Sequence, residues 1–189
     1  MWRKLDPSRE VHSGFGVVLK KWRRNADGVT AIEFAMVAGP FLMMLFGIIA
    51  VGLFYFTTFS LENAIEQASR SIRTGQAQRG NMTADQFKAS VCANVPSFVD
   101  CSGKLRVNVM NFPSSAAINP ATLPSCIAND GSLNAASSFI PVQENVVVLA
   151  WLCYEWTLAK DIPFLNLSNM GNGSRLIQAT TTFRTEPYK

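Results

Sequence analysis

GVTAIEFAMVAGPFLMMLFGIIAVGLFYFTTFSL, residues 28–61, is the stretch that decides the fold of this 189-residue chain. Residues 34–61 carry no charged side chain over 28 positions, which is about 42 Å of α-helix. The hydrocarbon core of a bilayer is roughly 30 Å thick, so this length predicts a membrane-spanning helix rather than the buried helix of a soluble protein. A secretory signal peptide has a shorter apolar region, and no convincing cleavage site for one follows near Leu61.

The apolar stretch passes into an amphipathic stripe that lengthens the expected helix. As far as Ile72, apolar residues recur at spacings of three and four, while charged and amide side chains fall on the other faces. Arg73 in the last turn and Gly75 directly after it are typical stop signals. We therefore expect one helix over residues 29–75, which spans a membrane over about residues 34–58 and then lies against a folded domain.

The basic residues gather before the apolar stretch. Residues 1–28 hold seven Lys and Arg against three Asp and Glu, so this leader accounts for the chain's whole net charge of +4. Lysine and arginine favour the cytoplasmic side of a membrane, which predicts a cytoplasmic leader and a periplasmic domain over residues 76–189. A nucleic-acid site is the weaker interpretation, because no basic face interleaved with aromatic residues follows.

Residues 76–189 have the pattern of a small α+β domain. Thr83 and Gln86 form a capping-box pattern ahead of a short helix. Residues 112–139 are rich in Ser, Ala, Asn and Pro and are expected to form a long loop. The predicted fold is α+β, with the long helix packed on a small, mostly antiparallel sheet of about three strands. The strand patterns cover residues 104–111, 145–156 and 176–185, of which the second is the central strand.

The four cysteines all follow the apolar stretch, which favours an oxidising compartment and disulfides. Cys92 and Cys101 are close in sequence, and a bridge between them is the first candidate. Cys126 and Cys153 then form the second candidate pair. Four cysteines allow three connectivities, and a free, buried Cys153 with a single bridge is a further alternative.

The chain offers little for catalysis or metal binding. Its only histidine, His12, lies in the leader, so none is available outside to activate a serine or cysteine nucleophile. The carboxylates after the apolar stretch make no recognisable acid–base signature, and no Cys-x-x-Cys spacing suits zinc. The sequence therefore predicts a protein that is not an enzyme and that holds no metal and no cofactor.

Glu33 is a charged residue at the start of the long apolar helix, and an acid in this position is costly in lipid. In one interpretation its carboxylate reaches the cytoplasmic interface and stays in water, which costs little. In the other, the chain is cut after Gly28, and the new α-amino group on Val29 lies one helical turn from Glu33. That cation, from the same subunit or a neighbour, would compensate the carboxylate in a layer of low dielectric.

A resemblance supports the second interpretation. The run AIEFAMVAGP at residues 31–40, followed by FL at 41–42 and LFGII at 45–49, resembles the TadE-like family of tight-adherence (Tad) pilus proteins. These are minor pilins, or pseudopilins, of the type IVc pilus system. One departure is Ala50, at a position where the family often carries a second acid.

The resemblance implies an assembly protein of the bacterial inner membrane. It implies cleavage by a prepilin peptidase between Gly28 and Val29, with Glu33 as the fifth mature residue, which serves processing or assembly. The implied partners are the peptidase, the lipid bilayer, other pilin-like subunits and the Tad machinery, with or without incorporation into a surface pilus. Two alternatives stay open: an uncleaved single-pass envelope protein whose outer domain binds a ligand, and a pseudopilin of a general secretion machine.

Overall fold

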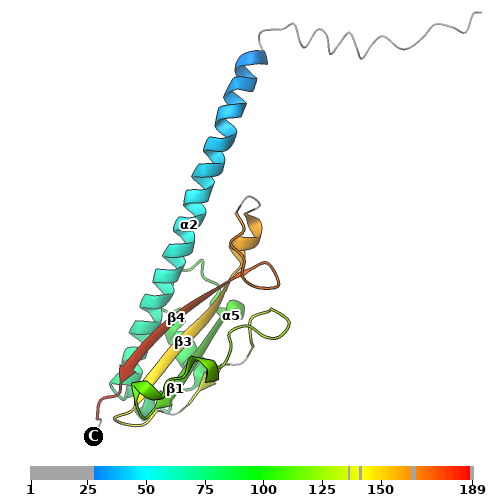
Figure 1. Ribbon diagram of the computed structural model, residues 1–189. Helices are drawn as coiled ribbons and strands as arrows, with labels where there is room; N and C mark the ends of the chain where they lie inside the picture. The colour runs from blue at the N-terminus through cyan, green and yellow to red at the C-terminus, as the bar shows by residue number, and fades with distance from the viewer. Residues whose placement is uncertain (1–27, 136, 141, 163–164, 188–189) are drawn as a thin grey trace, which may run out of the picture. The chain divides into compact units, whose positions relative to one another are not determined.

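The computed structural model describes residues 28–135, 137–140, 142–162 and 165–187 (Figure 1). The basic leader before Gly28, with His12, lies outside these residues. The chain divides into two compact units, Met1–Ile48 and Ile49–Lys189, and each is described by itself below.

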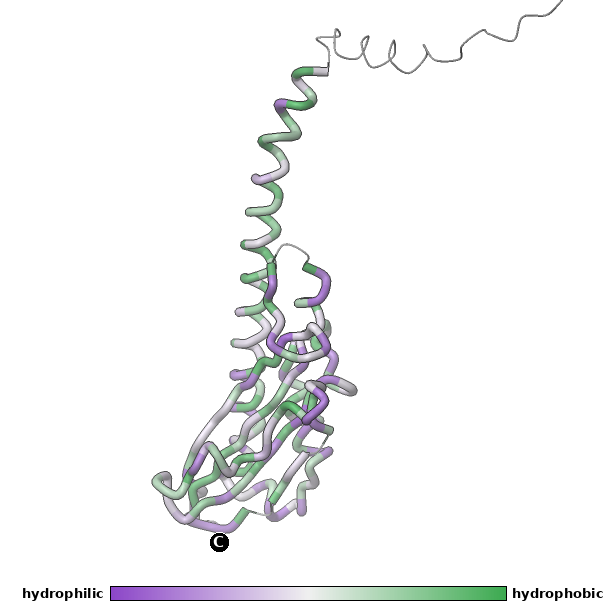
Figure 2. The backbone as a smooth tube through the Cα atoms, turned by 45° about the vertical axis from the view of Figure 1, so that its right-hand side comes forward, coloured by the Kyte–Doolittle hydropathy of each residue, from purple (hydrophilic) through white to green (hydrophobic). Residues whose placement is uncertain are grey.

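The long helix is α2, Val29–Arg73, with 45 residues, and the prediction of one long helix is confirmed. Hydrophobic residues predominate in its first part, and hydrophilic residues become frequent toward its end (Figure 2). Pro40 lies inside the helix, which continues on both sides of it. The helix ends where the sequence predicts, because Gly75 adopts the left-handed conformation, at φ 75°, that glycine tolerates without strain.

The second unit contains a four-stranded sheet in the order β2-β1-β3-β4. Antiparallel pairs join β1 to β3 and β3 to β4, while β2 pairs with β1 in parallel. The predicted α+β class and the central position of the strand pattern at residues 145–156 are therefore confirmed. The strands are β1 Leu105–Phe112, β2 Ser138–Phe139, β3 Val147–Trp156 and β4 Arg175–Arg184.

The expected count of about three strands falls short by one, because β2 lies at the end of the stretch that the sequence predicts as loop. Only two residues pair, Ser138 opposite Asn108 and Phe139 opposite Val109, which is too short for any period to show in the sequence. The Asn108 side-chain oxygen accepts a hydrogen bond from the Ser138 N–H at 2.9 Å. A buried asparagine thus replaces part of the ladder that a longer strand would make.

Short helices connect these strands to α2. The predicted capping box is present: the Thr83 hydroxyl accepts from the Gln86 N–H at 3.3 Å, and the Gln86 side chain accepts from the Thr83 N–H at 2.9 Å. The short helix that follows ends at Cys92, before Pro96. The helices are α3 Gln76–Arg79, α4 Ala84–Cys92 and α5 Cys101–Lys104, with 3-10 turns η2 Ser115–Ala117, η3 Pro120–Thr122 and η4 Thr157–Asp161.

The core of the second unit lies between α2 and one face of the sheet. The predicted stripe on α2 is buried, with Leu61, Ile65 and Ile72 inaccessible to solvent. Burying a side chain of this size contributes about 1.5–3 kcal/mol, so the stripe is a main source of the domain's stability. The other face of β3 belongs to a second cluster around Trp151 and Cys153, so both faces of the central strand are covered.

Candidate functional site

The residues predicted for processing lie at the start of α2. Gly28 is exposed directly before the helix, Val29 is its first residue, and Glu33 is exposed one turn later. A side chain built on Gly28 would meet nothing within 4 Å. The described part of the chain therefore leaves room for a larger side chain at this position.

The helix around Glu33 presents a continuous apolar surface. Phe34 is 74% exposed, and the large apolar side chains that follow, as far as Ile49, are exposed as well. Among the described helices, α2 alone is long and apolar enough to cross a membrane, with a mean hydropathy of 2.3 over its most apolar 18 residues. Exposure of such a large apolar surface to water is unfavourable, so this segment needs a lipid or protein environment.

A family comparison matches this helix. Residues 28–70 fit the family described as TadE-like protein. This segment is TadE-like. The match begins at Gly28, one residue before α2, and it confirms the resemblance seen in the sequence. No curated protein and no solved structure matches the chain.

The TadE-like segment leads into a domain with two disulfides. Cys92, at the end of α4, is bonded to Cys101, the first residue of α5. Cys126, from the long loop, is bonded to Cys153 in β3, so this bridge holds the loop on the face of the sheet that is turned away from α2. The structure thus pairs the four candidate cysteines consecutively, and the described residues contain no free cysteine.

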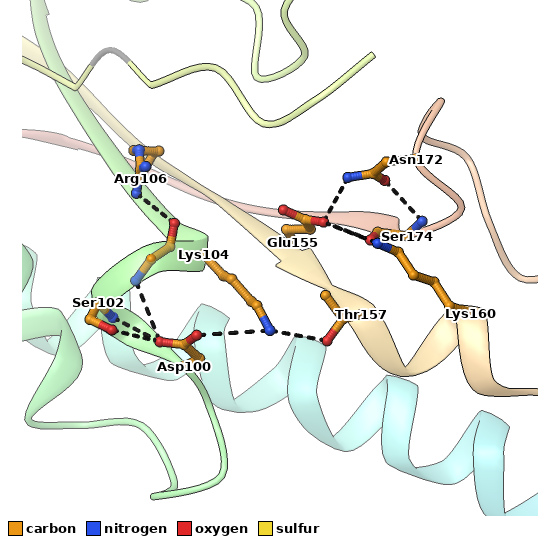
Figure 3. Close-up of polar contacts among 10 residues, drawn as sticks. Asp100, Ser102, Lys104, Arg106, Glu155, Thr157, Lys160, Asn172 and Ser174 are labelled. Carbon is orange, nitrogen blue, oxygen red and sulfur yellow. Dashed lines mark hydrogen bonds and ion pairs between the residues drawn. The ribbon is translucent and has the colours of Figure 1, made fainter. Parts of the chain in front are cut away.

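Two polar clusters occur near the carboxyl end of β3, and both stabilise turns (Figure 3). Asp100 caps α5 by accepting from the Ser102 hydroxyl at 2.8 Å and from the Gly103 N–H at 3.4 Å. These two hydrogen bonds hold the pKa of the Asp100 carboxyl below its usual value. Lys104 completes this cluster, because its Nζ donates to the Thr157 hydroxyl at 3.2 Å.

Glu155 is the centre of the second cluster. Its carboxylate accepts from the Ser174 hydroxyl at 2.6 Å and from the Asn172 side-chain amide at 2.8 Å, and it lies 4.0 Å from the Lys160 ammonium. The cluster fastens η4 and the turn before β4 to the central strand. That turn needs Gly173, whose φ is 81°. A serine beside a carboxylate without an imidazole is not a nucleophilic triad, and the single histidine of the chain is His12.

A polar groove of about 840 Å³ runs between α2 and β4 within the second unit. Arg70, Arg73 and Arg184 line it, together with Glu66 and Glu186, and none of these five forms an ion pair with another described residue. The Ser69 hydroxyl in its wall is buried without a hydrogen-bond partner. Sequence patterns do not reveal this groove, because the helix and the strand that form it are more than 100 residues apart.

Metal binding finds no support in the part of the chain that the structure describes. No three His, Cys, Asp or Glu side chains there gather closely enough to hold an ion. Burial also raises the pKa of the Tyr154 hydroxyl, so this tyrosine stays protonated and does not serve as a base near neutral pH. That the protein is not an enzyme remains a prediction.

Proposed function

We propose that the protein is a minor pilin-like subunit of a Tad, type IVc, adhesive pilus, and that a prepilin peptidase cuts it between Gly28 and Val29. The observation that carries the proposal is the TadE-like match, which begins at Gly28 and covers the helix with the exposed apolar surface. The basic leader, residues 1–28, is the cytoplasmic part that is removed. The exposed position of Gly28 suits a bond that a peptidase must reach.

Cleavage creates a cation beside Glu33. The new α-amino group on Val29 lies one helical turn from the Glu33 carboxylate, at a spacing where side chains on a helix are neighbours. In the low dielectric near lipid, an ammonium stabilises a carboxylate far more than it does in water. The amine comes from the same subunit or from its neighbour in the assembly, and in the second case cleavage and the register of the assembly are coupled.

The spanning part of α2 and the folded domain take different environments in this proposal. The first part of α2 crosses the inner membrane once, over about residues 34–58, with the amino terminus in the cytoplasm. Residues 76–189 form the periplasmic domain, where two disulfides suit an oxidising compartment. Exposed Gly52 and half-exposed Gly39, with free space where a side chain would stand, permit close approach of other pilin-like helices.

The mass of the mature amino terminus tests the proposal most directly. Protein extracted from membranes of cells that contain the whole Tad machinery should start at Val29. Gly28→Leu should retain the leader, whereas Val29→Ala should still be cut. Because a side chain at Gly28 meets no other part of the described chain, a block in Gly28→Leu reports recognition by the peptidase rather than misfolding. A wild-type chain that keeps Met1 contradicts the proposal.

The role of Glu33 needs a separate experiment. Glu33→Gln keeps the size of the side chain and removes its charge, so we expect normal insertion but reduced pilus formation or processing. Glu62→Gln is the matched control, because Glu62 is exposed on the same helix outside the proposed span. Normal piliation in Glu33→Gln contradicts the role given to this carboxylate.

The envelope-protein alternative has one observation in its favour, the polar groove between α2 and β4. Its three unpaired arginines suit an anionic ligand of an uncleaved, single-pass protein. Retention of the leader, together with loss of ligand binding in Arg70→Gln and not in the exposed control Arg79→Gln, would favour that alternative.

A further inference from the structure

Within the second unit, the folded domain contacts α2 as early in the helix as Phe54. The Phe54 ring lies edge-to-face with Trp156 of β3, at 5.5 Å between centroids, and the Arg175 guanidinium lies 4.8 Å above the same ring. Ala50, one turn earlier, is only 7% exposed. Within the second unit, the domain therefore covers α2 from Ala50 onward.

These contacts limit the length of helix that lipid alone can surround. Residues 34–49 are 16 residues, or about 24 Å of helix, whereas the hydrocarbon core is roughly 30 Å thick. The helix needs about one more turn to cross the hydrocarbon core, and that turn begins at Ala50, where the domain starts to cover α2. A span that starts at Val29 gains about 7.5 Å and still ends at Ala50. In both cases the outer surface of the hydrocarbon core lies at the level where the domain begins.

The domain carries exposed apolar side chains at this level, which we call the apolar patch: Tyr55, Phe56, Phe59, Phe98 and Leu158. Phe98 is 54% exposed, and its ring lies 5.9 Å from that of Phe56, so a loop residue and a helix residue share the same depth. Leu158 is 45% exposed in η4, two residues after Trp156. Lys160 follows in the same turn with its ammonium partly exposed.

We infer that the apolar patch lies in the boundary between the headgroups and the acyl chains of the bilayer, so that the periplasmic domain rests on lipid. Trp and Tyr are enriched at this depth, and the apolar faces of interfacial helices, with Phe and Leu among their residues, reach about 5–10 Å into it. Three of the five residues of the apolar patch belong to α2, the helix proposed to cross the bilayer, which favours lipid over a separate protein partner. Lys160 is then placed to meet lipid phosphate. The inference rests on the proposed function only in that α2 crosses a membrane; it requires no cleavage.

The depth of single labels tests the inference. The full chain is placed in nanodiscs of phosphatidylethanolamine and phosphatidylglycerol, with trifluoromethyl-phenylalanine replacing Phe46, Phe98 or Phe112 in turn. Dissolved oxygen concentrates in hydrocarbon and a nickel chelate stays in water, so the ratio of their effects on ¹⁹F relaxation reports depth. Phe46 lies in the apolar stretch, and Phe112 lies at the opposite end of β1 from the Trp156 end of the sheet.

We expect the oxygen-to-nickel ratio to be several-fold higher at Phe98 than at Phe112, and higher still at Phe46. A ratio at Phe98 equal to that at Phe112, with Phe46 in hydrocarbon, overturns the inference and leaves the proposed function intact. A water-exposed Phe46 overturns the membrane span, and both proposals with it. Because Phe98 is exposed, its label should not disturb the fold; a label at Leu158 should repeat the result.

Discussion

The two ends of α2 use the same kinds of apolar residue in opposite ways. Ile48, in the first unit, is 61% exposed, whereas Ile65, in the second unit, is inaccessible to solvent. The first part of the helix is apolar all round, and the second is apolar on one stripe only. A helix that is apolar all round needs a surrounding apolar medium, whereas a stripe needs one packed face. The comparison teaches that periodicity, more than hydrophobicity, tells a lipid-facing isoleucine from a core isoleucine.

The largest expected effect comes from truncating the two isoleucines. Ile65→Ala leaves a cavity between α2 and the sheet and should lower the free energy of unfolding of the domain by about 2–5 kcal/mol. Ile48→Ala, the matched control, should change it by less than about 0.5 kcal/mol. Chemical denaturation in detergent, followed by tryptophan fluorescence, measures both. Equal losses would break the distinction drawn here between the two ends of the helix.

The disulfides should affect only the second unit. Replacing Cys126 and Cys153 by alanine releases a loop closed over a separation of 27 residues, which should cost about 3.5 kcal/mol in the chain-entropy account. Replacing Cys92 and Cys101, 9 residues apart, should cost about 2.6 kcal/mol. The same denaturation experiment orders the two variants. A larger loss for the shorter loop would contradict the loop-length explanation.

The capping box of α4 gives a smaller effect in the same unit. Thr83→Ala removes the hydroxyl that satisfies the Gln86 N–H, and the loss should be about 1 kcal/mol. Thr83→Ser keeps the oxygen and should lie within a few tenths of a kcal/mol of the wild type. If serine and alanine have the same effect, the cap contributes through packing and not through its hydrogen bond.

The smallest effect is the pH dependence that Asp100 contributes. Hydrogen bonds from Ser102 and Gly103 lower the pKa of this carboxyl below its usual 3.8. A pKa lowered by folding stabilises the native state above the unfolded value, and that stability is lost as the pH falls through the folded value. Unfolding between pH 5 and pH 2 should therefore show a shallower acid slope in Asp100→Asn. Ser102→Ala, which removes the hydroxyl donor to Asp100, should change the slope in the same direction. An unchanged slope in both variants would show that Asp100 does not contribute to the pH dependence of stability.

Much of the fold was predictable because its signals are local. The length of α2, its end at Gly75 and the Thr83 cap each depend on residues within one or two turns of one another. The central strand was recognisable because both its faces are buried, which removes the alternation of a half-buried strand. The two-residue strand β2 was missed because its pairing depends on Asn108, 30 residues away.

The candidate sites divide in the same way. Gly28, Val29 and Glu33 are recognisable because the proposed processing depends on a short linear segment, and the family match covers that segment. The groove beside β4 and the contact between Phe56 and Phe98 depend on tertiary packing. Phe98 carried no distinctive signal, because Val95 and Val99 in the same connection are apolar as well, and nothing in the sequence placed it beside α2.

The consecutive pairing of the cysteines has a consequence for biogenesis. If the domain is translocated from its amino end, Cys92 and Cys101 emerge first and meet each other before any later thiol arrives. Cys126 and Cys153 then emerge as the next two and bond in turn. An oxidase that joins thiols in order of arrival therefore yields the native bridges directly, and maturation does not depend on an isomerase to reshuffle them.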